Sequence, residues 1–284
     1  MRALLIFACV GLCWAQPRGA RKPVFPVDTQ DPKLAGGAEL LEAVCPGHVD
    51  VGKEIQCKTE CPEFTGFAGG GPRWNAAGVI RGHFLSPSSD DVVLAMEGCE
   101  SHGANFGGTI LLTRRSQKWR MLWYKAGVPT QQCHKIKRSD RREILICIGS
   151  YGGQGNVWTA LYMEDLLSPY ATLMAGDAGI LFEVFDNILT CGSMSDDPSK
   201  PTPLTRHYIE RVEFRTRPDG SIRGLSVLAR EGERSMTSEQ VQVCIAEQLP
   251  TRPHRGIDFS PPTKPYRVDF TFDGYSFKRY TLVK

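Results

Sequence analysis

The sequence predicts an all-β protein built from antiparallel strand meanders, with a small cysteine-tied module near its N-terminus. Three observations favour this class. Glycine and proline are frequent, with 29 and 19 residues, and divide the chain into short segments. Many of these segments are rich in β-branched and aromatic residues, and several alternate apolar with charged positions, as half-buried strands do. Three cysteines also lie close together in a stretch with little apolar content, before the segments begin.

Residues 1–15 have the pattern of a signal peptide. A cationic start and an apolar run are followed by Cys13-Trp14-Ala15, a small-residue cleavage pattern. The run is too short to span a bilayer, so we expect it to be removed and expect no transmembrane segment in the mature chain. The sequence thus predicts a secreted or periplasmic protein. The short signal and the lack of an Asn-x-Ser/Thr sequon favour a bacterial source.

Eight cysteines follow the signal, and an even number in an exported chain predicts a disulfide framework. Cys57 and Cys61 are the closely spaced pair with which a zinc or redox site would begin, but no second close pair follows. The spacing leaves the pairing open, although we expect Cys45 to pair with Cys57 or Cys61, because the segment between them needs covalent ties. The eight are Cys45, Cys57, Cys61, Cys99, Cys133, Cys147, Cys191 and Cys244.

Composition divides the chain into four parts. After the signal, residues 16–44 are proline-rich and lack apolar periodicity, which predicts a flexible N-terminal arm with a short helical turn over 38–42. Residues 45–72 form the small cysteine-containing module. Residues 73–284 form a β-rich domain.

Within the β-rich domain, strands are expected between turns of hairpin length. Their ranges are 77–84, 91–97, 109–113, 119–124, 134–137, 143–148, 156–162, 179–185, 187–191, 209–215, 224–228, 266–272 and 275–280. The segment 238–249 allows a helix capped by Ser238 or an alternating strand, and the helix is favoured. Residues 193–205 are expected to form an exposed loop.

One unit, consisting of a strand, an acidic turn, a buried strand, a glycine turn and another strand, occurs twice. Its first copy contains Gly82-His83-Phe84, a polar turn ending in Asp90-Asp91, and an apolar strand. Over residues 78–165 this pattern resembles the FG-GAP or VCBS-type repeat of β-propellers. The resemblance implies an irregular or incomplete β-propeller-like fold, with a β-sandwich as the alternative. It also makes Asp90 and Asp91 calcium candidates, because the family's acidic loop commonly binds calcium.

The chain contains no recognisable catalytic motif, and no cofactor is expected. Neither a Gly-x-Ser-x-Gly elbow nor a His-Glu-x-x-His pair occurs. Lysine and arginine are scattered and the net charge is +3, which argues against a nucleic-acid partner. The densest basic segment, 135–142, is interpreted as a solvated hairpin tip, with a surface for anionic lipid or polysaccharide as the alternative.

Glu100, His102 and Asn105 are the candidate ligand-binding residues, because they share a glycine-bearing loop between two buried strands. The leading hypothesis is an exported, disulfide-stabilised binding or structural protein of the periplasm or cell envelope, with an unidentified ligand. A hydrolase that uses loop carboxylates such as Glu100 and Asp165 is the second hypothesis. A thiol or metal protein at Cys57 and Cys61 is the third.

Overall fold

The computed structural model confirms the all-β class. It describes residues 25–58, 61–62, 74–99, 108–153, 156–167, 179–188, 191, 203–248 and 260–279. These residues contain fourteen strands and two helices, and the strands form three antiparallel sheets. Each sheet is a meander in which strands adjacent in sequence pair with one another, as the sequence predicts.

The first sheet contains six strands in sequence order. They are β1 (Val49–Val51), β2 (Ile55–Cys57), β3 (Asn75–Gly82), β4 (Asp91–Glu97), β5 (Gly108–Arg115) and β6 (Lys118–Ala126). Strand β4 lies between β3 and β5 and is buried on both faces, which explains its unbroken apolar run. Strand β6 forms one edge of this sheet.

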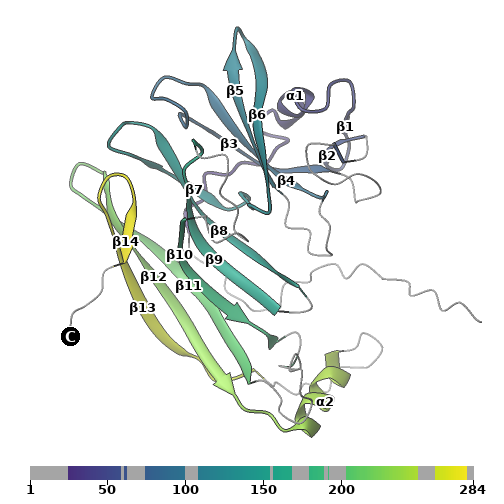
Figure 1. Ribbon diagram of the computed structural model, residues 1–284, viewed down its shortest axis with the longest axis vertical. Coiled ribbons are helices and arrows are strands. Elements are labelled where there is room, and N and C mark those ends of the chain that lie inside the picture. The colour runs from purple at the N-terminus through teal and green to yellow at the C-terminus, as the bar shows by residue number, and fades with distance from the viewer. Residues whose placement is uncertain are drawn as a thin grey trace, which may run out of the picture.

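The second and third sheets contain four strands each, and in Figure 1 they lie side by side and curl into a half-barrel. The second sheet consists of β7 (Cys133–Lys137), β8 (Glu143–Gly153), β9 (Asn156–Glu164) and β10 (Gly179–Asp186). The third consists of β11 (Leu204–Thr216), β12 (Ile222–Arg234), β13 (Lys264–Phe272) and β14 (Phe277–Arg279). The predicted C-terminal hairpin is present, and Gly274 takes the positive φ of 100° at its turn.

The prediction of a strand over 187–191 is wrong for the described residues 187, 188 and 191, which do not form a strand. Asn187 leaves the sheet because its side chain accepts a hydrogen bond from the Thr205 amide (2.7 Å) and donates one to the Pro203 carbonyl (3.0 Å). These contacts satisfy backbone groups at and just before the start of β11. The predicted loop over 193–205 lies mostly outside the described residues, and β11 begins at Leu204.

The core is layered because the second sheet buries both of its faces. One face, with Leu145 and Tyr162, packs against Val93 and Leu111 of the first sheet. The other face packs against the third sheet, in a cluster that includes Ile146, Leu161, Leu225, Val227 and Phe270. The far face of the first sheet is covered by α1 (Gly37–Glu42), whose Leu40 and Leu41 are completely buried.

An N-terminal strap, residues 25–30, connects all three sheets. Phe25 enters the core between the second and third sheets, with its ring centroid 5.8 Å from that of Phe214 in β11. The Asp28 amide donates to the Cys133 carbonyl (2.8 Å) at the start of β7. Gln30 forms a β-bridge with Val79 of β3. The part of the predicted flexible arm that is described, residues 25–44, is therefore packed and hydrogen-bonded.

The predicted N-terminal module is confirmed as a disulfide-tied unit that extends the first sheet. Cys45 is bonded to Cys57, one of the two partners expected from the sequence. Strand β2 pairs with both β1 and β3. Cys61 is bonded to Cys99 just beyond β4, so a second disulfide fixes the module to the sheet.

The ambiguous segment near the C-terminus forms α2 (Ser238–Gln248), as favoured. Its cap is Thr237 rather than Ser238. The Thr237 hydroxyl accepts from the Gln240 amide (3.2 Å), and the Gln240 side chain accepts from the Thr237 amide (2.9 Å), which makes a capping box. Cys244 bonds to Cys191 and attaches the helix to the end of the second sheet. No helix in the described ranges has the length and apolar character needed to cross a membrane.

Candidate binding site at the tip of the first sheet

A buried carboxylate shapes the loop that precedes β4. Asp91 is 0% exposed and accepts hydrogen bonds from the Phe84 amide (2.9 Å), the Leu85 amide (2.8 Å) and the Thr113 hydroxyl (2.8 Å). The Ser89 hydroxyl donates to the same carboxylate. Asp91 thus fixes the loop over 84–90, here called the tip loop, against β5.

Asp90 has a different surrounding. Its side chain lies 3.6 Å from the Arg114 guanidinium, and its carbonyl accepts a hydrogen bond from the Arg114 amide (2.9 Å). The two calcium candidates of the sequence therefore face guanidinium and hydrogen-bond donors. In the part of the chain that the structure describes, no group of three or more His, Cys, Asp or Glu residues is placed to hold a metal ion.

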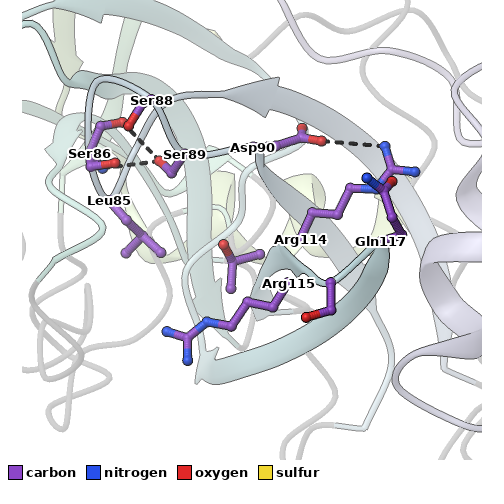
Figure 2. Close-up of a pocket in the computed structure, with 10 residues that line it drawn as sticks. Leu85, Ser86, Ser88, Ser89, Asp90, Arg114, Arg115 and Gln117 are labelled. Carbon is purple, nitrogen blue, oxygen red and sulfur yellow. Dashed lines mark hydrogen bonds and ion pairs between the residues drawn. The ribbon is translucent and has the colours of Figure 1, made fainter.

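The tip loop and the hairpin between β5 and β6 enclose an open hollow with a volume of about 550 Å³. Figure 2 shows the tip loop on one side of this hollow and the charged hairpin side chains on the other. We call it the tip hollow. Its lining residues are Leu85, Ser86, Ser88, Ser89, Asp90, Thr113, Arg114, Arg115, Ser116 and Gln117.

The hairpin has a tight two-residue turn. Ser116 and Gln117 both take positive φ, at 49° and 64°, as in a type I′ turn. This conformation costs a residue other than glycine about 1–3 kcal/mol. The turn places Arg115 directly opposite Lys118, and Thr113 opposite Arg120. The three cationic side chains consequently share one face of the hairpin.

The end of the hairpin carries an uncompensated positive charge. Arg115, Lys118 and Arg120 are exposed, and none has an ion-pair partner among the described residues. Like charges that lie directly opposite one another destabilise a strand pair. On the other face, the guanidinium groups of Arg81 and Arg114 lie 5.5 and 5.6 Å from the Trp119 ring centroid, so each makes a cation–π contact with that ring.

The tip hollow is also rich in hydrogen-bond donors. The Ser89 hydroxyl is engaged with the Ser86 carbonyl (2.8 Å) as well as with Asp91. The side chains of Ser86, Ser88, Ser116 and Gln117 have no hydrogen-bond partner within the described ranges. Together with the Arg115 guanidinium they suit a ligand that carries negative charge and hydroxyl groups.

The ligand-binding residues expected from the sequence follow β4 in the chain. Glu100, His102 and Asn105 lie outside the described residues. Their loop follows Cys99, which lies beyond Glu97 at the end of β4 opposite to Asp91. The two predictions thus concern opposite ends of β4. Calcium was expected in the tip loop before the strand, and the ligand site in the loop after it.

Two arginines of the basic segment over 135–142, Arg138 and Arg142, form a structural junction, whereas Lys137 and Arg141 are exposed. The Arg138 and Arg142 side chains are 14% and 10% exposed. Each of them pairs with Asp140 and Asp165, at 3.1 Å for Arg142–Asp165. The Arg138 guanidinium also lies 4.9 Å from the Tyr275 ring centroid, which connects this hairpin of the second sheet to the third.

Asp165 is occupied by this junction. Burial alone would raise its pKa, but hydrogen bonds from Arg142 and from the Leu167 amide, with the charges of Arg142 and Arg138, lower the pKa of Asp165 below its ordinary value. A carboxylate held ionised between two guanidinium groups is unsuited to act as a general acid. The ion pairs favour a structural role for Asp165. The hydrolase hypothesis stays a prediction, and its other candidate, Glu100, lies outside the described residues.

A second buried ion pair joins the first and second sheets. Lys125 of β6 and Glu164 of β9 are bonded to each other, and both side chains are 1% exposed. The Lys125 ammonium also lies 4.7 Å from the Trp123 ring centroid. Burial raises the pKa of Glu164, and the adjacent Lys125 opposes that rise. Neither group reaches solvent, so the pair has a structural role.

The third functional hypothesis, a thiol or metal site at Cys57 and Cys61, is wrong. Cys57 is bonded to Cys45 and Cys61 to Cys99, so neither presents a free thiolate. The remaining pairs are Cys133–Cys147 and Cys191–Cys244. All eight cysteines are therefore bonded, which is consistent with an exported, disulfide-stabilised protein.

Sequence reasoning overlooked the hairpin half of the tip hollow. Residues 114–120 contain four cations and no acidic residue, whereas the longer basic segment over 135–142 contains Asp140. The absence of an acidic residue near these four cations is the sequence feature that could have indicated a cationic surface at this hairpin.

Comparison of the chain with known protein families, with curated proteins and with solved structures finds no match in any of the three.

Proposed function

We propose that the protein is an exported binding protein of the periplasm or cell envelope that holds its ligand in the tip hollow. The observation that carries the proposal is the set of donors without partners in that hollow, on a framework fixed by Asp91 and the turn at Ser116 and Gln117. Ligand sites are concave and largely pre-formed, and a few precisely placed polar groups give them their specificity. The disulfides and the signal-like residues 1–15 support export.

Binding suits the hollow better than catalysis. Among the described residues that line it, Asp90 is the one carboxylate and is paired with Arg114, and none is a histidine or cysteine. An acid–base mechanism needs a titratable group near a reacting atom with a second group to complement it. The lining residues supply hydrogen bonds and positive charge, which hold a ligand without transforming it.

The test compares two serine variants. Ser88→Trp places an indole in the tip hollow, whereas Ser235→Trp adds the same side chain at an exposed position after β12. Each purified protein is offered a panel of soluble glycans and fractionated envelope extracts, and the retained component is identified by mass spectrometry. We expect wild type and Ser235→Trp to retain the same component and Ser88→Trp to lose it.

The opposite results are equally clear. Retention of the same component by all three proteins would remove the tip hollow from the function. Turnover of a panel component by the pure protein, with no stable retention, would replace the binding role with an enzymatic one.

A further inference from the structure

We propose that the ligand of the tip hollow is an acidic polysaccharide, a hydroxyl-rich polymer with repeated carboxylate or sulfate groups. This inference rests on the proposed function and adds the chemical class of the ligand. It follows from how the cations continue beyond the hollow, from the neutral donors inside it, and from the scarcity of apolar groups around it.

The cations continue away from the hollow along one face of the hairpin. Arg115 lines the hollow, Lys118 lies opposite it, and Arg120 follows two residues further along β6, about 7 Å on. A ligand with a single negative group can contact Arg115 and Lys118, which lie opposite each other, but it leaves Arg120 without a partner. A polymer with negative groups at intervals meets all three and relieves the repulsion between Arg115 and Lys118.

The donors inside the hollow are neutral as well as charged. The hydroxyls of Ser86, Ser88 and Ser116 and the amide of Gln117 match the alternating donors and acceptors of sugar hydroxyls. The nearby Trp119 indole lies on the other face of the hairpin and already contacts Arg81 and Arg114, so sugar stacking on it forms no part of the inference. Recognition would depend on hydrogen bonds and charge.

A membrane surface fits less well. Proteins that lie on anionic lipid combine cations with apolar side chains that enter the bilayer boundary. Of the described residues that line the hollow, only Leu85 has a large apolar side chain, and it is partly buried. The exposed Leu122 of β6 stands alone beyond Arg120. Vesicle binding is therefore an outcome of the test rather than the proposal.

The experiment uses polymers matched in backbone and different in charge. Polygalacturonate is compared with its methyl ester, and dextran sulfate with dextran, so that carboxylate and sulfate are tested separately. Affinity is measured by calorimetry at two salt concentrations. We expect wild type to bind at least one acidic polymer, to bind neither neutral one, and to bind more weakly at the higher salt.

Two charge-matched triple variants complete the test. The first combines Arg115→Gln, Lys118→Gln and Arg120→Gln, and we expect it to weaken binding by about tenfold or more. The control combines Lys33→Gln, Arg223→Gln and Lys264→Gln, which removes three exposed charges elsewhere, and we expect a change of less than about twofold. Circular dichroism of both variants verifies that the fold is retained.

Several results would overturn the inference. Equal losses in the two triple variants would show that net charge alone attracts the polymer. Binding only to vesicles with anionic phospholipid would reassign the cations to a lipid surface. Binding to a neutral polymer, or to none of the four, would reject the acidic class. The proposed function is tested independently, by whether Ser88→Trp loses the envelope component that wild type retains.

Discussion

At the scale of single residues, the neighbouring carboxylates Asp90 and Asp91 have opposite roles. Asp91 is completely buried and holds the tip loop through four donors, whereas Asp90 is exposed and faces one guanidinium. The sequence places both in a polar turn before a buried strand, which is correct. It could not separate their roles, because the donor from Thr113 and the charge of Arg114 come from the next strand.

Removal of the Asp91 carboxylate should destabilise the fold. Asp91→Ala leaves the buried amides of Phe84 and Leu85 without an acceptor, and we expect the free energy of unfolding to fall by about 3 kcal/mol. Asp90→Ala, the control, should change it by less than about 1 kcal/mol, because its ion pair is exposed. Urea denaturation measures both. Equal losses in the two variants would mean that the tip loop does not depend on Asp91.

Neutralisation of Asp90 should instead favour binding. Asp90→Asn leaves Arg114 without its ion-pair partner beside the tip hollow, so affinity for an acidic polysaccharide should rise by about threefold. Glu213→Gln is the matched control, because Glu213 also pairs with an arginine, Arg211, on the third sheet. Calorimetry compares the two variants. An affinity that falls in Asp90→Asn would make Asp90 a ligand-binding group.

Asp165 predicts a loss of stability in acid. Its pKa is lowered in the folded protein, so the unfolded chain takes up a proton first as the pH falls. The stabilisation is complete well above the ordinary pKa of about 4 and is lost as the pH falls through the lower folded value. Asp165→Asn should therefore be less stable than wild type at pH 7, and the difference should shrink below about pH 4. A difference that stays constant from pH 7 to pH 3 would contradict the ionised junction.

At the scale of elements, the sequence pattern predicted the strands and turns that depend on interactions between neighbouring residues. Alternation marked β11 and β13, and the Asp273-Gly274 turn marked the last hairpin. The N-terminal strap was missed because residues 25–30 have no periodicity, and its partners lie in sheets far along the chain. The likeness of residues 78–165 to an FG-GAP repeat stays a prediction; its two units lie in the first and second sheets.

The strap offers a test within a single segment. Phe25 is 8% exposed in the core, whereas Val27 is 46% exposed. Phe25→Ala should lower the free energy of unfolding by about 3 kcal/mol, and Val27→Ala should change it by less than about 0.5 kcal/mol. Thermal and urea unfolding of both variants measure the contrast. Similar small effects in the two would show that the strap does not hold the sheets together.

At the scale of the whole molecule, two of the four disulfides attach peripheral segments to the sheets. Cys61–Cys99 ties the N-terminal module to the first sheet, and Cys191–Cys244 ties α2 to the end of the second. The sequence established that the cysteines pair but left most partners open, because pairing depends on how distant segments meet. The tip hollow could not be predicted from the sequence for the same reason, because its two halves belong to the β3–β4 and β5–β6 hairpins.

Intact mass after alkylation measures this framework directly. We expect none of the eight paired cysteines to react before reduction and all eight to react afterwards. Protein made in a reducing cytosol should unfold at lower denaturant, because each disulfide contributes about 2–4 kcal/mol. Two thiols that react before reduction and map to Cys57 and Cys61 would restore the thiol hypothesis.

The N-terminal strap has a consequence for how the protein reaches its folded state. Asp28 is synthesised early, yet its hydrogen bond with the Lys135 amide joins residues 107 positions apart. The contact between Phe25 and Phe214 spans a still longer stretch of the chain. Contacts of such high sequence separation close late and fold slowly. The strap can therefore dock only after β7 and β11 have been synthesised, although its own residues come first in the described chain. Closure of these contacts joins three sheets that are each built from sequence-adjacent strands, which places it among the last steps of folding.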